Sequence, residues 1–489
     1  MIFKEYGNYD GIGLADLVKR KEISPTTLID TAIDAIGQVN PQLNCVVQTL
    51  RKQAISDMKV APQSSPFYGV PFLVKEFGMH FKGMTSSAGS RLSEGVKFQS
   101  DSELMTRCRN AGLLTVGTTT TPEMAFNANC ESVLYGSTCN PWNLNHSAGG
   151  SSGGAGAAVA SGVVPIAHAN DGGGSIRIPA ACNGLVGMKP TRGRTPTGPD
   201  GGIFLWGLAV EFALTRSVRD SAALLDAVAG PDDGYFYTAE PPEGSFLSAA
   251  MSHPESLRVG VVEQLPGCAK PKKESAEKLN KTRTLLEELG HKCETVKLNY
   301  SAEELNESTI RLWATTLGFY MEQFSKMTGR KINSKTVEAV TLETYRYAKK
   351  LNAMELEWAM SAQNSVSRSV GATMRDYDVL LSPVLARDVA KLGELDQNAK
   401  GVDLVAWWRQ LMHDYCIYTP LFNTTGQPAI VLPLWQSKSG LPLAMQFVGR
   451  LGGEETLYSL ANQIEAALPW ANRKPPIYIG SKAERGAMK

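Results

Sequence analysis

The chain has 489 residues, of which 43% are hydrophobic and 20% charged, the composition of a globular protein with a large buried core. Its formal net charge is +1 and its Lys and Arg residues are scattered, which argues against a nucleic-acid or acidic-membrane partner. We expect small, largely uncharged partners. Since the sequence shows neither a secretion signal nor a run of about 20 apolar residues, we expect a cytoplasmic protein.

Helices and strands alternate along the first half of the chain. Ser24 and Pro25 are typical of a helix N-cap and a first helical position, so we predict a helix that begins there. Apolar periodicity predicts further helices at 102–110, 155–161 and 217–229, and strands at 69–77, 113–116 and 163–169. Residues 232–254 turn to Pro, Gly, Asp and aromatic residues, which indicates a connection across the surface.

The second half continues the alternation. Its pattern predicts strands at 257–262, 379–381, 429–432 and 443–448, and helices at 274–290 and 455–468. Residues from about 301 to 375 have helical spacing, and we predict a helical subregion whose core includes the aromatic residues Trp313, Phe319, Tyr320 and Tyr345. The whole pattern predicts an α/β fold, a sheet with helices on both faces. Because no long polar linker interrupts it, we expect residues 1–489 to form a single domain.

Cysteine and histidine spacing gives no sign of a metal site. The eight cysteines lie far apart without a CxxC motif, which favours reduced thiols over disulfides. The six histidines form neither an HExxH motif nor a pair four residues apart. We therefore predict neither a metal nor a cofactor.

Residues 149–194 hold two serines, Ser151 and Ser175, that stand among glycines. Glycines leave backbone N–H groups bare beside a nucleophile, where an oxyanion needs them. The run Asp-Gly-Gly-Gly-Ser that ends at Ser175 follows a predicted strand, and such a turn can aim consecutive amides at one point. The alternative is a structural turn whose serine caps the next helix. A serine hydroxyl also needs a base, and Lys75, at the end of an apolar run, is the candidate.

Two other interpretations of the glycine segment are disfavoured. The GGSSGG run matches the GxSxG elbow of α/β-hydrolases, but His413 lies in a tryptophan-rich helical stretch and no HGGG-type motif precedes the elbow. A phosphate-binding loop is disfavoured because no GK[ST] follows the glycines.

The order of the motifs resembles the amidase signature family. The family hallmark GGSSGG, GxDxGGSIRxPA and GLxGxKPTxGR is matched in that order by 149–154, by Asp171, 173–177 and 179–180, and by 184–194, and GVPxxxKE precedes it at 69–76. The resemblance covers nearly the full length. It implies the amidase signature fold, a central twisted mixed β-sheet with helices on both faces, with a catalytic core at 66–230.

The resemblance also implies the site. Ser175 is the expected nucleophile, Ser151 a bridging serine after a cis peptide bond from Gly150, and Lys75 the base. Apolar neighbours of Lys75 make a lowered pKa plausible, because a buried amine loses its proton more easily. The expected oxyanion hole is formed by the backbone amides of Gly172, Gly173, Gly174 and Ser175, and the expected supporting residues are Ser152, Asp171 and Arg177.

The implied function is amide hydrolysis. We expect an amidase that cleaves the C–N bond of a small, largely uncharged amide, carbamate or ester through an acyl-enzyme on Ser175; a homodimer is compatible with this interpretation. The branch resembles cyclic-amide (nylon-oligomer) hydrolases and aryl or carbamate-cleaving amidases, so the chain is a urethanase candidate. The alternative is the glutamine-hydrolysing subunit of a tRNA-dependent amidotransferase, where Gln is typical at the position of Ile178.

Two further expectations concern the loops of the site. Asn170 departs from the usual family pattern, which predicts a more flexible oxyanion loop. The loop at 121–130 corresponds to one that lines the acyl pocket in relatives, so Phe126 and Asn127 are candidate substrate contacts, with ordinary loop packing as the alternative. The segments 197–212 and 301–375 are expected to shape the rest of the pocket.

Overall fold

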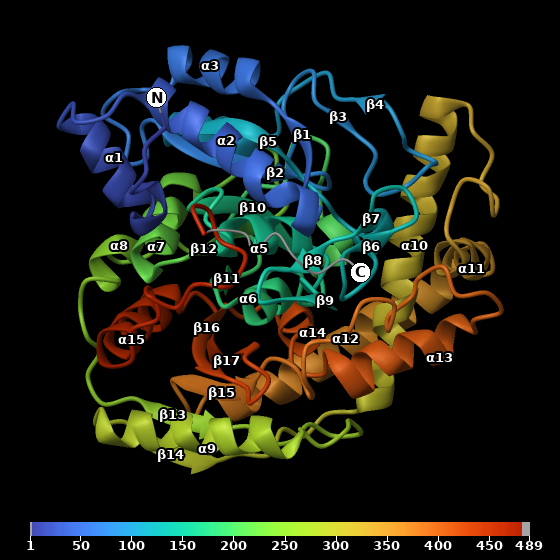
Figure 1. The fold of residues 1–489 in the computed structure, drawn as a ribbon. Coiled ribbons are helices and arrows are strands. Elements are labelled where there is room, and N and C mark those ends of the chain that lie inside the picture. The colour runs from blue at the N-terminus through green and yellow to red at the C-terminus, as the bar shows by residue number, and fades with distance from the viewer. Residues whose placement is uncertain (1, 482–489) are drawn as a thin grey trace.

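A central sheet of 11 strands organises the molecule, whose computed structural model describes residues 2–481 (Figure 1). The strands follow the spatial order β1-β5-β2-β10-β12-β11-β16-β17-β15-β13-β14. Their bounds are β1 (Val46–Thr49), β2 (Val70–Lys75), β5 (Leu113–Thr119), β10 (Ile166–Asp171), β11 (Val186–Lys189), β12 (Val210–Thr215), β13 (Arg258–Val261), β14 (Lys292–Thr295), β15 (Val379–Pro383), β16 (Ala429–Gln436) and β17 (Pro442–Gly449).

The sheet is mixed, as the resemblance implies. β2 runs parallel to both β5 and β10, and β13 runs parallel to β14 and β15, whereas β12, β11, β16 and β17 pair antiparallel with their neighbours. Every residue of β2, β5, β10 and β12 is buried, as expected for strands whose two faces are both covered.

Helices flank this sheet in several groups. Their bounds are α1 (Gly11–Lys19), α2 (Pro25–Leu43), α3 (Arg51–Val60), α4 (Glu103–Asn110), α5 (Gly153–Ala160), α6 (Arg177–Asn183), α7 (Val218–Val228), α8 (Phe246–Ala249), α9 (Lys273–Glu288), α10 (Ala302–Thr328), α11 (Ala339–Ala348), α12 (Ala353–Met374), α13 (Leu404–Arg409), α14 (Pro420–Thr424) and α15 (Glu454–Ala467). α5 and α6 pack on each other and on the central strands, and α7, α8 and α15 form another packed group. The α/β prediction is confirmed.

Short elements fill the connections. They are η1 (Tyr6–Asn8), η2 (Glu123–Ala125), η3 (Phe204–Gly207) and the π-helical turn η4 (Gln410–Tyr415), together with the strand pairs β3 (Thr85–Ser86) with β4 (Val96–Lys97), β6 (Glu131–Ser132) with β7 (Gly136–Ser137), and β8 (Cys139–Asn140) with β9 (Asn143–Ser147). None of the helices in the described part of the chain is long and apolar enough to cross a membrane.

Local sequence signals account for the helix ends. Ser24 caps α2 by accepting a hydrogen bond from the backbone N–H of Thr27, and Pro25 occupies the first turn, as predicted. Ser217 caps α7 in the same way. β12 is a different case. Its first three residues belong to the segment 197–212, which we expected to shape the pocket, and its last three follow that segment directly. The strand forms because its apolar run is buried between β10 and β11.

α10, α11 and α12 form the helical region that the sequence predicts between two sheet strands. They follow β14 and precede β15, and α10 packs on both α11 and α12 (Figure 1, yellow to orange). α10 also contacts η3 and β4, two short elements from the first half of the chain. This long helix therefore brings its own side chains to the region where the predicted catalytic residues lie.

Candidate active site

The predicted catalytic residues come from the end of β2 and from two loops at the same edge of the central sheet. β2 and β10 are parallel neighbours, so Lys75 and Asp171, the last residue of each strand, lie at the same edge of the sheet. Ser151 belongs to the turn before α5, and Ser175 to the loop between β10 and α6. The peptide bond between Gly150 and Ser151 is cis, as the resemblance implies.

Lys75 is fully buried and has three polar neighbours. Its Nζ lies 2.8 Å from Ser151 Oγ, 3.0 Å from Ser152 Oγ and 2.6 Å from Asn170 Oδ1. None of these neighbours is charged. Ser152 stands at the N-cap of α5 but makes no capping bond; its hydroxyl instead donates to the carbonyl of Asn170 at 3.4 Å.

Burial changes the acid–base properties of this lysine. Removal from water lowers the pKa of Lys75 from 10.5 to about 7, and the negative charges of Glu211 and Asp171 oppose this change without cancelling it. A pKa near 7 means that a large fraction of the amine is neutral at neutral pH. The side chain is therefore able to accept a proton, which an ordinary exposed lysine is not.

Asn170 and His168 connect Lys75 to a buried carboxylate, Glu211. Asn170 Nδ2 donates to Glu211 Oε1 at 3.2 Å and to the carbonyl of Phe77 at 2.8 Å. The backbone N–H of Lys75 donates to His168 Nδ1 at 3.3 Å, so the ring proton lies on Nε2, which donates to Glu211 Oε2 at 2.6 Å. These bonds fix the side chain of Asn170, and the more flexible oxyanion loop stays a prediction.

Ser175 opens onto the same cavity as Ser151 but is not hydrogen-bonded to it. Within residues 2–481, no side-chain hydrogen bond of Ser175 Oγ is present, and Ser175 as a whole is 7% exposed. Catalytic contacts are often loose before substrate binds. Ser175 does not cap α6, whose N-cap is Ile176 and lacks a side-chain bond, so the purely structural alternative for this serine does not hold.

The oxyanion loop differs from the prediction at one position. The N–H of Gly174 donates to Asp171 Oδ1 at 2.7 Å and is therefore not available to a substrate. The amides of Gly172, Gly173 and Ser175 have no acceptor among the described residues. Gly174 has φ +135°, and a Cβ there would lie 2.3 Å from Thr419 Oγ1, so this turn requires glycine.

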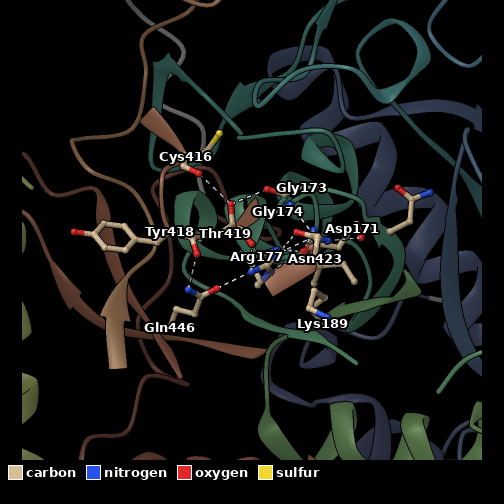
Figure 2. A network of polar contacts seen from close by, with 12 residues as sticks. Asp171, Gly173, Gly174, Arg177, Lys189, Cys416, Tyr418, Thr419, Asn423 and Gln446 are labelled. Carbon is tan, nitrogen blue, oxygen red and sulfur yellow. Dashed lines mark hydrogen bonds and ion pairs between the residues drawn. The ribbon is translucent and has the colours of Figure 1, made fainter. Parts of the chain in front are cut away.

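Asp171 and Arg177 form the buried support of this loop (Figure 2). Arg177 pairs with both carboxylate oxygens of Asp171 at 2.9 Å, and its remaining N–H groups reach Thr419 O, Gln446 Oε1 and Asn423 Oδ1. Burial alone would raise the pKa of Asp171, but Arg177 and the amide of Asn423 outweigh it and lower the pKa to about 2. The carboxylate is thus ionised and holds the loop through the N–H groups of Gly174 and Ile176.

The cavity at Ser175 is narrow and mostly apolar. It encloses about 20 Å³, room for about one water molecule. Beside Ser151, Asn170, Gly172 and Ser175, it is lined by Phe77, Ala125, Phe204, Leu205, Ala209, Trp313, Thr316, Leu317 and Tyr320. Eight of these nine residues lie in the segments 121–130, 197–212 and 301–375 that we expected to line or shape the pocket, and Phe77 lies outside them. We assigned the aromatic residues of 301–375 to the core. Trp313 belongs to the core and also lines this cavity, Tyr320 lines this cavity, and Phe319 is 59% exposed, so the core assignment is wrong for Phe319.

Phe126 and Asn127 do not line this cavity. The ring of Phe126 is packed among Trp313, Trp407 and Trp408, with centroid separations of 5.4 Å. Asn127 Nδ2 donates to the carbonyl of Leu395 at 2.8 Å, and its Oδ1 accepts from the next backbone N–H. Both side chains are engaged in loop packing, as the structural alternative describes, and their contact with a substrate stays a prediction.

The remaining polar chemistry of the molecule adds no metal centre to this site. Among residues 2–481, no three His, Cys, Asp or Glu side chains come together in a way that could hold a metal ion. The eight cysteines are unpaired thiols.

Comparison with known proteins agrees with this geometry. A family model described as Amidase matches residues 27–458. The chain is 35% identical over 486 residues to the 6-aminohexanoate-cyclic-dimer hydrolase of Paenarthrobacter ureafaciens, with 97% of each chain covered. A structure of 6-aminohexanoate cyclic dimer hydrolase complexed with substrate matches with a TM-score of 0.91 at 33% identity, covering 96% of this chain and 99% of that one.

A bacterial aryl acylamidase of the amidase signature family matches with a TM-score of 0.84 at 25% identity, covering 95% and 97% of the two chains. These relatives are hydrolases of amides, which favours that activity over the glutamine-hydrolysing subunit of an amidotransferase. The chain belongs to the amidase signature family, a family of amide hydrolases.

Proposed function

We propose that this enzyme hydrolyses the C–N bond of a small neutral amide through an acyl-enzyme on Ser175, with Ser151 and Lys75 as the proton relay. The contacts of Lys75 carry this proposal. A neutral amine has two N–H donors and one lone pair. Asn170 Oδ1 can only accept, and Ser152 donates its own proton to a carbonyl, so these two oxygens take the two N–H groups. The lone pair is left for the hydroxyl of Ser151 at 2.8 Å.

The chemical steps follow from this arrangement. Ser151 passes its proton to Lys75 while it accepts the proton of Ser175, whose Oγ attacks the carbonyl carbon. The oxyanion accepts hydrogen bonds from the amides of Gly172, Gly173 and Ser175. When the C–N bond breaks, the nitrogen takes the proton back through Ser151. Water then attacks the acyl-enzyme by the same relay and releases the acid.

The names of the relatives support cyclic and aryl amides as the substrate class, since they act on a 6-aminohexanoate cyclic dimer and on aryl acylamides. The test is a hydrolysis screen of aliphatic, aryl, cyclic and carbamate substrates, with free glutamine included. We expect turnover of at least one amide class and none with Ser175→Ala. Phenylmethanesulfonyl fluoride should add one sulfonyl group to the wild-type protein, on Ser175. An adduct on another residue, or full activity of Ser175→Ala, contradicts the proposal.

A further inference from the structure

A second and much larger cavity adjoins the one at Ser175. It encloses about 490 Å³, within the range of sites that bind small molecules. Its walls come from the segment after β2, from the region around β3 and β4, from 196–211 and from the last turns of α10. Most of its surface is apolar, and the apolar side chains that line it include Met79, Met84, Phe98, Phe319, Phe324 and Met327.

Three aromatic side chains separate the two cavities. Phe77, Phe204 and Tyr320 line both of them. Their rings form a continuous row, since the centroid of Phe204 lies 6.2 Å from that of Phe77 and 6.3 Å from that of Tyr320. We call this row the aromatic wall. On one side of it there is room for about one water molecule, and on the other side for a ring system or a chain.

The carboxylates around the large cavity already have hydrogen-bond partners. Glu76 accepts hydrogen bonds from Thr118 and Tyr135, and Glu211 accepts from His168 and Asn170. Asp200 pairs with His80 at 3.0 Å. These carboxylates disfavour an anionic occupant, whereas an apolar one would replace water on the methionine and phenylalanine side chains.

The aromatic wall lies on that side of the cavity at Ser175 where the proposed proton relay of Ser151 and Lys75 lies. Asn170, which holds Nζ of Lys75, donates both to the carbonyl of Phe77 in the wall and to Glu211 at the edge of the large cavity. In the proposed reaction the substrate nitrogen takes its proton from Ser151, the partner of Lys75. The oxyanion amides, in contrast, belong to the loop that Asp171 and Thr419 hold. The nitrogen side of the amide therefore faces the wall.

Phe204 is the member of the wall with the most adaptable backbone. Glycines stand at 201, 202 and 207, and Leu205 and Trp206, which follow Phe204 directly, have φ of +49° and +56°. Non-glycine residues rarely adopt this region, so the segment is held in a costly conformation that another arrangement can relieve.

We propose that the large cavity binds an apolar aryl or alkyl group carried on the nitrogen of the scissile amide, and that the aromatic wall separates to admit it. This inference rests on the proposed function and narrows its substrate class to N-substituted amides. The acyl part of the substrate then lies on the opposite side of Ser175 from the aromatic wall. Substrates that share an acyl group form the same acyl-enzyme, whatever group their nitrogen carries.

The first experiment fills the large cavity. Met84→Trp is compared with wild type on acetamide and on N-(2-naphthyl)acetamide, which give the same acetyl-enzyme. We expect kcat/KM to fall at least tenfold for the naphthyl substrate and less than twofold for acetamide. Met374→Trp is the matched control, because Met374 is also a buried methionine but lies at the end of α12 and lines neither cavity. Equal losses on both substrates, or a selective loss on octanamide, whose bulk is on the acyl side, overturn the inference.

The second experiment opens the wall and does not depend on turnover. Phe204→Ala should raise kcat/KM at least threefold for the naphthyl substrate without a matching rise for acetamide. In the Ser175→Ala background, titration with 2-naphthylamine should show binding that Met84→Trp weakens at least tenfold. If Met84→Trp does not fold, Phe204→Ala decides, and an equal effect on both substrates overturns the inference. Failure of the proposed function looks different: wild type then hydrolyses neither substrate and Ser175 takes no sulfonyl group.

Discussion

Glu211 is the charged group that most opposes the lowered pKa of Lys75. Asn170 bridges the two, with its Oδ1 at 2.6 Å from Nζ and its Nδ2 at 3.2 Å from Glu211 Oε1, so the charges are at most about 8 Å apart. The histidine partner does not cancel the carboxylate charge, because His168 accepts at Nδ1 and is neutral. At an effective dielectric constant of about 20, such a pair interacts by about 2 kcal/mol, or about 1.5 pH units.

Glu211→Gln keeps the shape of the side chain and removes its charge. We expect the pKa of Lys75 to fall below its present value of about 7, so that the base stays neutral in more acidic solution. The acidic limb of the kcat/KM profile should move down by about 1.5 pH units. Asn170→Asp places a new carboxylate beside Nζ and should move the same limb up.

The assay is kcat/KM for one amide between pH 5 and 9, repeated as the rate at which phenylmethanesulfonyl fluoride modifies Ser175. Glu123→Gln is the matched control, since Glu123 is also a buried carboxylate but is bonded to Ser90 and to the backbone N–H of Glu338, away from Lys75. An acidic limb that stays at the same pH in Glu211→Gln and Asn170→Asp, or that moves in the same direction in both, refutes this account of Lys75.

Three more predictions concern the relay and its support. Ser151→Ala removes the group between Lys75 and Ser175, and we expect kcat to fall at least a hundredfold with little change in KM; a change confined to KM argues for a binding role. Lys75→Met removes a buried amine that, between pH 7 and 10.5, binds a proton only in the unfolded protein. Wild-type stability therefore rises with pH in this window. The free energy of unfolding of the variant, relative to that of wild type, should fall by about 1.4 kcal/mol per pH unit. Urea unfolding at pH 7.5 and 9.5 measures this difference, and a difference that is the same at both pH values contradicts the assigned pKa. Arg177→Lys cannot reach Asp171, Thr419, Gln446 and Asn423 together, so we expect a loss of about 3 kcal/mol, seen as a lower Tm, and an unaltered Tm contradicts the support role.

The sequence was most informative where a motif fixes the backbone. The glycine-flanked serines and the lysine that ends β2 belong to motifs within residues 75–175. The parallel pairing of β2 with β10 brings them to one edge of the sheet. Helix ends such as Ser24 and Ser217 were predictable for the same reason, since a cap depends on neighbouring residues alone.

The parts that the sequence did not predict depend on contacts between distant segments. The sequence shows Asn170 only as a departure from the family pattern, and its bonds to Lys75, Phe77 and Glu211 are visible only once three strands lie side by side. Phe126 and Trp313 lie far apart in the chain and pack together, and only the folded structure shows that one belongs to the aromatic packing behind the site and the other also lines its cavity.

The pairing of Asp171 with Arg177 separates two responses to acid. The carboxylate that shapes the oxyanion loop has a pKa of about 2, whereas Lys75 has a pKa of about 7. Between these values acidification protonates the base but leaves the loop intact. At pH 5 the enzyme should therefore be inactive while the oxyanion loop keeps its structure, and its activity should return as soon as the solution is neutralised.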